Sequence, residues 1–416
     1  MARETRLTKE AEPAATVPEP AVTSRFDGID LLRGLSIIAV ILLHGQIRLL
    51  FTYGSSIRNL LPQQLMRIVF WQGGNGVTVF FAISGFLITL TSLRRFGSLA
   101  RMRARTFYRI RFARIAPLLF LLLVVLSVLH LLAVDGFHIN PVRGTLPRAL
   151  FAAFTFQINW YEAVHGYLPA NWDVMWSLSV EEMFYLFFPL ACLALLRWKR
   201  GMPLFVLVLL ALVATGPFAR TVWTTNAIWK DTSYLCGMSG IALGCLTALL
   251  TDWLQRRKPP WASGRLLPAI QIAGAALMLL IVVWPPWHWM NMLGRSGTDD
   301  TLLGLATCLI MLGSVLRGHK GSAWTAPVRW FGRHSYEVYL THEFVVVGMT
   351  ELYVKVHRAS PLIWIAAEVA LAAPLGWAVA KWYSEPMNRR LRGAAAPRAA
   401  GHPHKSKRDA APGSGN

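Results

Sequence analysis

Long apolar runs, separated by short polar segments, dominate the pattern of this chain. A helix needs about 20 mostly apolar residues to cross a lipid bilayer, and ten runs approach that length. The pattern therefore predicts an all-α fold, a polytopic transmembrane bundle of about ten spanning helices. The predicted helices cover residues 29–50, 76–93, 115–134, 176–196, 203–219, 233–253, 266–284, 300–316, 335–354 and 361–382.

One apolar segment, at 149–160, is too short to span a bilayer. If it did span, the basic segment at 197–200 would move to the outer side together with later basic loops. We therefore predict that residues 135–175 form a loop outside the cytoplasm with an interfacial or re-entrant piece. Tryptophan is enriched at membrane–water interfaces, and we expect this placement for Trp160, Trp172, Trp176 and the aromatic loop at 284–292.

Lysine and arginine are concentrated in alternate segments between the runs. With the N-terminus inside, the inner segments hold 30 of the 42 basic residues, the outer segments hold 9 and the runs hold the other 3. Cytoplasmic loops carry the excess of basic residues, so we expect both termini in the cytoplasm. The chain then divides into a disordered tail at 1–24, which lacks the apolar core of a signal peptide, a membrane domain at 25–392 and a disordered basic tail at 393–416.

The composition agrees with a membrane protein and argues against other classes. Only 15% of the residues are charged and the mean hydropathy is +0.42, whereas a soluble domain carries about 25% charged residues. The net charge of +21 falls largely in short segments beside apolar runs, which suits a lipid bilayer and argues against nucleic acid. The four cysteines lie in apolar runs without metal-ligand spacing, so we expect no metal site.

The first apolar run carries two ionisable residues, Arg33 and His44. They are eleven residues apart, about three helical turns, so they share a face about 16 Å apart along the axis. Ionisable side chains inside a membrane usually face the bundle interior or a watery cavity. The alternative is that Arg33 reaches the interface and His44 only hydrogen-bonds a neighbouring helix.

Two further pairs of charged residues are spaced so that they could belong to a binding or catalytic site. Arg111 and Arg114 are three residues apart, so on a helix they share a face, where two arginines suit a phosphate-bearing ligand. The alternative is a topology signal beside anionic lipid.

Glu181 and Glu182 point about 100° apart on a helix, so we expect only one to face the interior. They could orient a histidine or bind a sugar hydroxyl, or form a structural ion pair.

Near the end of the chain, His342 and Glu343 are again ionisable residues within an apolar run. They do not begin a zinc-protease motif, because position 346 is valine rather than histidine. Ser84 and Gly85 are small residues in the second predicted helix, where they predict close packing of helices.

Five stretches, taken in order, resemble the integral-membrane acyltransferase family 3, whose members modify hydroxyls of glycans and some natural products. The stretches are DLLRGLSIIAVILLH, GVTVFFAISGFLI, RIRFARIAP, WSLSVEEMFYLFFP and RHSYEVYLTHEF. The resemblance covers about residues 25–392. It departs at Thr78, where many relatives carry an acid, and at the C-terminus, where some relatives carry a fused esterase-like domain and this chain has a short basic tail. We therefore expect the chain to finish transfer itself or with a partner.

The resemblance implies an O-acyltransferase of the bacterial cytoplasmic (inner) membrane, multi-pass, without a permanently bound cofactor. Acyl-coenzyme A, most simply acetyl-coenzyme A, would enter from the cytoplasm as co-substrate. The acceptor would be a hydroxyl of a glycan, a lipid-linked glycan or a small molecule. The resemblance and the pattern together assign catalysis to His44, Arg33, Glu181 and Glu182, coenzyme A binding to Arg111 and Arg114, and substrate binding to His342 and Trp176.

Several alternatives stay open at this point. His44 could act as a general base or carry the acyl group itself. A transporter or flippase for a lipid-linked sugar or small anion would also have about ten helices and buried ionisable residues, although the chain shows no internal repeat. A membrane scaffold is the third option. The sequence gives neither the acceptor, the acyl chain length nor the oligomeric state.

Overall fold

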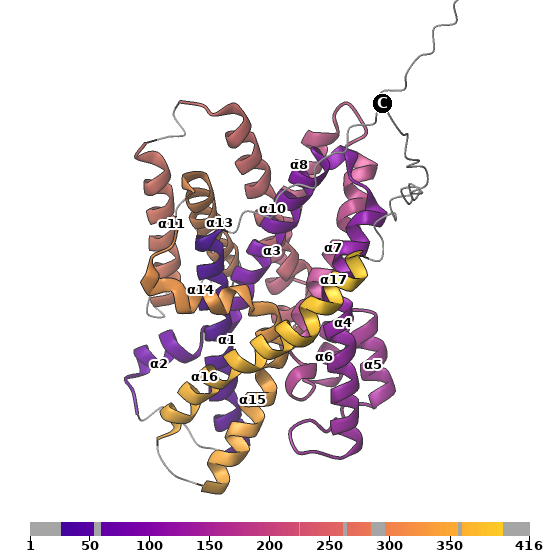
Figure 1. Cartoon of the computed structure of the whole chain (residues 1–416), viewed down its shortest axis with the longest axis vertical. Coiled ribbons are helices and arrows are strands. Elements are labelled where there is room, and N and C mark those ends of the chain that lie inside the picture. Colours follow the sequence, from indigo (N-terminus) through magenta and orange to yellow (C-terminus); the bar gives the residue numbers. More distant parts are fainter. Residues whose placement is uncertain are drawn as a thin grey trace, which may run out of the picture.

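A computed structural model of the chain describes residues 26–53, 60–223, 225–260, 264–283, 296–318, 320–356 and 360–393. Across these ranges every regular element is helical (Figure 1), which confirms the all-α prediction. The predicted tails, except Gly393, and the aromatic loop at 284–292 lie outside the described residues.

Each of the ten predicted spans corresponds to one long helix. These are α1 (Asp27–Tyr53), α3 (Gly73–Phe96), α4 (Ala104–Leu131), α7 (Met175–Leu195), α8 (Gly201–Thr221), α10 (Tyr234–Arg257), α11 (Leu266–Val283), α13 (Thr298–Arg317), α15 (Ser335–Val356) and α16 (Pro361–Val379). The shorter helices are α2 (Gln63–Phe70), α5 (Leu146–Phe154), α6 (Ile158–His165), α9 (Ala227–Thr232), α14 (Ala326–Arg333) and α17 (Glu385–Gly393).

Nine helical stretches within the described ranges are long and apolar enough to cross a membrane. The predicted span that is not among them is α15. Its polarity is the reason, because it carries Glu337, Glu343, Glu351 and Lys355. A helix with this many charges needs protein around it rather than lipid, and α15 packs between α1 and α16.

The helix α4 begins at Ala104, well before the predicted start at residue 115. The basic segment is therefore helical, as expected for a run rich in arginine, a good helix former. Because this segment is helical, Arg111 and Arg114 are held on a rigid element rather than on a loop.

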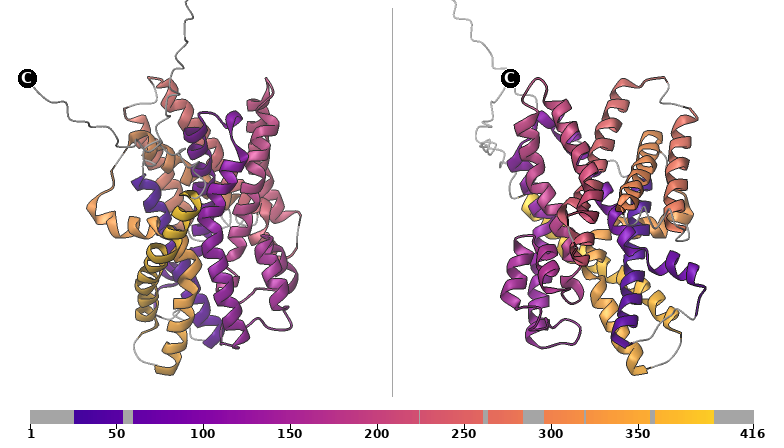
Figure 2. Two further views of the ribbon diagram at one scale, coloured as in Figure 1. Left: turned by 45° about the vertical axis from the view of Figure 1, so that its right-hand side comes forward. Right: turned by 180° about the vertical axis from the view of Figure 1, so that it is seen from behind.

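The loop predicted at 135–175 holds the short helices α5 and α6, neither of which could span a bilayer. The view from behind in Figure 2 shows them beside α4 and away from α11 and α13. Trp160 is 56% exposed, but the interface prediction is wrong for Trp172, which is fully buried in a core with Met175 and Leu340. An indole surrounded by protein contributes to packing and cannot contact the lipid head groups.

Small residues bring helices together at the centre of the bundle. A side chain at Gly85 of α3 would overlap the carbonyl oxygen of Ile241 on α10, and one at Gly244 would overlap that of Ala82. This close crossing confirms the packing predicted for Gly85. The helix α1 contacts α3, α14, α15 and α16, so its polar residues face protein on several sides.

Candidate active site

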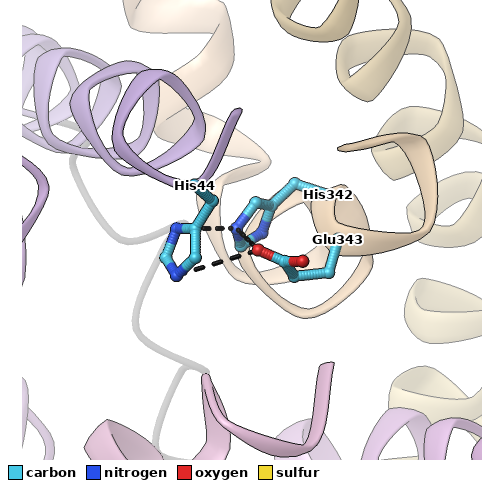
Figure 3. A group of neighbouring side chains, drawn as sticks. All are labelled: His44, His342 and Glu343. Carbon is cyan, nitrogen blue, oxygen red and sulfur yellow. Dashed lines mark hydrogen bonds and ion pairs between the residues drawn. The ribbon is translucent and has the colours of Figure 1, made fainter. Parts of the chain in front are cut away.

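His44 of α1 and His342 of α15 meet inside the bundle (Figure 3). His342 Nε2 lies 3.4 Å from His44 Nδ1, and the rings are edge to face with centroids 5.1 Å apart. Glu343 Oε1 lies 3.7 Å from Nε2 of each histidine. His342 is fully buried, whereas the His44 side chain keeps 21% of its surface exposed. His44 is thus the member of the pair that a substrate can reach.

The hydrogen bonds of the two rings assign their tautomers. His44 Nδ1 lies 2.8 Å from the Val40 carbonyl oxygen, and His342 Nδ1 lies 2.7 Å from that of Tyr339. A carbonyl oxygen only accepts, so each neutral ring carries its proton on Nδ1. His44 Nδ1–H then also faces the lone pair of His342 Nε2, and His44 Nε2 is left unprotonated. A lone pair held in a fixed direction is what a general base or a nucleophile requires.

Three arginines surround a cavity of about 130 Å³ next to this pair. One water needs only about 10–15 Å³, so the cavity has room for part of a ligand. Arg33, Arg111 and Arg114 line it, together with Glu181 and Tyr185. The structure thus brings together the arginine of the first span and the pair on α4, as the sequence prediction requires.

Glu181 lines the cavity and Glu182 does not. Glu182 Oε1 is nevertheless buried as well, so the two carboxyl groups differ in their access to the cavity. The Ser84 hydroxyl donates to Glu181 Oε1 at 2.6 Å. The guanidinium carbon of Arg111 lies 4.1 Å from the centroid of the Tyr185 ring, a cation–π contact that orients the arginine. These contacts hold the lining rigid before any ligand enters.

Tyr339 lies between the cavity and the histidines. Its ring lines the cavity, and its centroid lies 5.9 Å from that of His342. Its hydroxyl lies 3.0 Å from the Val174 carbonyl oxygen and 2.7 Å from Ser177 Oγ, so both ends of the side chain are fixed. Neither histidine lines the cavity itself, which places the basic centre just beyond its Tyr339 end.

Two residues that the sequence assigned to the substrate lie elsewhere. His342 hydrogen-bonds His44 and does not line the cavity. Trp176 packs against Phe81, with centroids 6.1 Å apart, and Phe81 in turn lines the cavity. Their roles stay predictions, and their positions favour support of the site over direct contact with a ligand in the cavity.

Sequence reasoning missed the carboxyl group of Glu368 on α16. Its side chain is 1% exposed, and a side chain at Gly45 would overlap it, so it packs against α1 beside His44. It also lies within electrostatic range of Glu343 and Arg48. A single acid within the apolar run 361–382 was the signal that could have found it.

His44, His342 and Glu343 could also hold a metal ion. Their nearest ligand atoms all lie within 4.8 Å of one another, and two imidazoles with a carboxylate suit zinc. Sequence spacing could not show this group, because 298 residues separate the two histidines. A metal here would occupy the lone pair of His44 Nε2.

Comparison with known proteins gives the family. A model of the acyltransferase domain of type 3 matches residues 26–381. The chain belongs to the acyltransferase 3 family. Membership of this family favours the acyltransferase hypothesis over the transporter and scaffold hypotheses. No solved structure matches this chain.

Three curated relatives are each 25% identical to this chain. The peptidoglycan O-acetyltransferase OatA of Listeria monocytogenes matches over 366 residues, 81% of this chain and 51% of the relative. The putative peptidoglycan O-acetyltransferase YrhL of Bacillus subtilis matches over 71% of this chain and 47% of its own length. The O-acetyltransferase OatA of Staphylococcus aureus matches over 79% and 52%. The chain thus spans about half the length of the curated relatives it matches.

The structure also explains the departure at Thr78. The Thr78 hydroxyl donates to Asp300 Oδ1 at 2.8 Å, and Asp300 forms an ion pair with Arg220. An acid from α13 therefore lies against position 78 of α3.

Proposed function

We propose that this protein is an O-acyltransferase of the bacterial cytoplasmic membrane that moves an acetyl group from acetyl-coenzyme A to a glycan hydroxyl. The observation that carries the proposal is the position of His44 beside a cavity lined by three arginines, with its Nδ1 2.8 Å from the Val40 carbonyl oxygen, which leaves Nε2 to act as the base. The names of the relatives support a glycan acceptor, and peptidoglycan is the first to test.

The arginines suit the donor. Coenzyme A carries several phosphates, and arginine binds phosphate through two parallel hydrogen bonds. Arg33 lies within electrostatic range of both Glu181 and Arg114, so the three cations and one carboxylate form a single charged lining. With the phosphates at Arg111 and Arg114, the thioester end would extend toward Tyr339 and His44.

His44 then transfers one proton. Its Nε2 accepts the proton of the acceptor hydroxyl while that oxygen attacks the thioester carbonyl. When the tetrahedral intermediate collapses, the carbon–sulfur bond breaks and the thiolate takes the proton from Nε2. The reaction yields an ester and free coenzyme A, without net uptake or release of a proton. Glu343 stabilises the imidazolium that exists between the two steps.

Attack of Nε2 on the thioester itself is the second route. Attack with the proton kept on Nδ1 would form an acyl-imidazolium and break the carbon–sulfur bond, which releases coenzyme A as its thiolate before the acceptor binds. The arginine cavity lies on one side of His44. On this route the donor would bind there, react and leave before the acceptor binds. Labelled acetyl that stays on the protein without acceptor, and is lost in His44→Ala, would distinguish it from direct transfer.

The test is release of free coenzyme A from acetyl-coenzyme A by the purified protein in lipid, with and without solubilised peptidoglycan strands. A general base contributes about 10²–10⁴-fold to the rate, so His44→Ala should lose acceptor-stimulated release by at least about a hundredfold. His138→Ala, an exposed histidine of the 135–175 loop, is the matched control and should behave as wild type. Full activity in His44→Ala would reject the proposed role.

A transporter would consume no acetyl-coenzyme A. If wild type releases none with any acceptor yet moves a lipid-linked sugar across vesicles, the proposed function is wrong. Equilibrium binding of acetyl-coenzyme A on the same sample separates a missing acceptor from a missing donor site.

A further inference from the structure

The cavity beside the histidines has two unlike ends. At one end the guanidinium of Arg111 lies over the ring of Tyr185. The opposite end is aromatic, because the rings of Phe80 and Tyr339 meet there edge to face with centroids 6.1 Å apart. Ser177, which hydrogen-bonds Tyr339 at the aromatic end, precedes Tyr185 by eight residues, about 12 Å along α7. A ligand that fills the cavity would therefore need a charged end and an apolar end.

The polar groups at the aromatic end satisfy one another. The hydroxyl oxygens of Tyr339 and Ser177 lie 3.0 and 3.2 Å from the Val174 carbonyl oxygen and 2.7 Å from each other. Each hydroxyl has one proton, so when one donates to the carbonyl the other donates to the first, and no donor is left for a ligand. The side chain of Phe80 presents only carbon atoms to the cavity. This end of the cavity therefore suits an apolar group.

The aromatic end is the end nearer to His44. Gly73, at the start of α3, packs so closely on Leu43, the residue before His44, that a side chain there would overlap it. Val77 and Phe80 line the cavity and follow Gly73 by four and seven residues, about 6 and 10 Å along α3. A donor must place its acyl carbonyl at this end to react with His44, so the apolar group that fits here is the acyl group.

The rings at the aromatic end are held in place by packing. Phe80 packs against the largest hydrophobic cluster of the bundle, and its neighbour Phe81 is buried so close to α10 that a side chain at Gly237 would overlap its ring. The ring of Tyr339 also packs against that of His342, with centroids 5.9 Å apart. Close-packed interiors adjust little to a change in size, and one methylene in an apolar pocket changes the relative rates of two substrates by about 10–200-fold. The aromatic end can therefore distinguish acyl groups by their length.

We propose that Phe80 and Tyr339 form the acyl pocket of this protein and restrict the donor to short acyl groups, with acetyl preferred. The inference rests on the proposed function, in which coenzyme A supplies the acyl group. With the phosphates of the donor at Arg111 and Arg114, the pantetheine arm would run along the cavity and the methyl group of acetyl would contact the Phe80 ring. A longer acyl chain would need the space that this ring occupies.

The test compares acetyl-coenzyme A with butyryl-coenzyme A as donors for wild type, Phe80→Leu and Phe80→Ala. Wild type should favour acetyl over butyryl by at least about tenfold in kcat/KM. Phe80→Leu should narrow this ratio about tenfold, and Phe80→Ala, which opens more space, should use butyryl better than acetyl. The matched control is Phe120→Ala, at a position of α4 that is 58% exposed and does not line the cavity, and it should keep the wild-type ratio.

Free coenzyme A separates a change in the pocket from a loss of folding. It has the phosphates but no acyl group, so its dissociation constant should stay within about twofold in both Phe80 variants. Val77→Ala enlarges the same end from another position on α3 and should narrow the donor ratio about fourfold. A donor ratio that all three enlarging variants leave unchanged, or a wild type that uses both donors equally, would overturn the inference.

Binding of the two thioesters, measured by calorimetry without acceptor, separates this inference from the proposed function. Tighter binding of acetyl- than of butyryl-coenzyme A, lost in Phe80→Leu, would support the pocket even if wild type transfers no acetyl, and the lack of transfer would reject the proposed function. Transfer to a glycan with a donor ratio that Phe80→Ala leaves unchanged would reject the pocket alone. If wild type binds neither thioester, both the pocket and the proposed donor are wrong.

Discussion

The two ends of the site differ in charge and in space. At the arginine end, Arg33, Arg111 and Arg114 line a cavity, with Glu181 as the carboxylate among them. At the carboxyl end, Glu343 lies beside both histidines and Glu368 packs against α1 next to His44, and each has one buried oxygen that lacks a hydrogen-bond partner among the described residues. His44 lies between the two ends and keeps part of its surface accessible.

This difference teaches how one histidine could serve two unlike substrates. A polyanionic donor is attracted by the arginine end and repelled by the carboxyl end, whereas a neutral polyol gains hydrogen bonds where unsatisfied oxygens are available. The charge distribution would thus direct each substrate to its own side of His44. Three predictions test whether the two ends of the site act on different substrates.

The largest effect is expected when the arginine end loses its charge. In the double variant Arg111→Gln/Arg114→Gln, kcat/KM for acetyl-coenzyme A should fall by at least about a hundredfold, because two charged hydrogen bonds of about 1.5–3 kcal/mol each are lost. Acetyl-pantetheine, which lacks the nucleotide phosphates, should be used about equally by variant and wild type. The measurement is release of the free thiol from each donor, coenzyme A from one and pantetheine from the other.

Arg105→Gln, at an exposed position of α4 that does not line the cavity, provides the comparison. It should lose less than about threefold, since it leaves the lining intact. An equal fall with both donors in the double variant would mean that the arginines do not bind the phosphates.

A smaller effect is expected from zinc at the junction of the two ends. Because zinc would take His44 Nε2, His342 Nε2 and Glu343 as ligands, micromolar zinc should reduce transfer about tenfold, and a chelator should restore it. His342→Gln removes one ligand and should need about tenfold more zinc for the same inhibition. The measurement is initial rate against free zinc, with magnesium as the control ion.

The opposite outcome would change the mechanism. If the chelator alone abolished activity and zinc restored it, the metal would belong to the reaction and His44 could not be the free base.

The helices could be predicted from the sequence because each span depends on local length and polarity. The start of α4 could not, since a basic segment is compatible with a loop as well as a helix, and packing decides between them. The same holds for Trp172: an aromatic residue next to a predicted membrane boundary suits the interface, but the loop folds back and buries it.

The candidate site, too, could be predicted only where local sequence is sufficient. Arg33, His44, Arg111 and Glu181 were visible as polar residues in apolar or basic helical patterns, and the structure brings them near one another. The contact of His44 with His342 depends on how α1 and α15 pack, which no spacing records. Glu162 lies in the segment 135–175, which the sequence predicts to be a loop. An acid is common in a loop, so only the full burial of Glu162 in the structure shows that this carboxyl group is unusual.

The smallest expected effect is on the pH dependence of the protein's stability against unfolding. It comes from the buried carboxyl group of Glu162. Burial, and then the charge of Asp173, raises its pKa, while the Leu168 N–H and Arg143 oppose the shift. The folded protein therefore keeps the proton over a pH range in which the unfolded chain, with a pKa of about 4.3, has lost it. Stability from this group is complete below that value and decreases as the pH rises toward the folded pKa.

Glu162→Gln removes this titration at nearly constant side-chain size. At pH 8 its melting temperature should exceed that of wild type by about 2 °C, and at pH 4 the two should be equal within error. Glu385→Gln, an exposed glutamate that pairs with Arg389, should show no such dependence. A gain of the same size at both pH values would mean that the pKa of Glu162 is not raised in the folded protein.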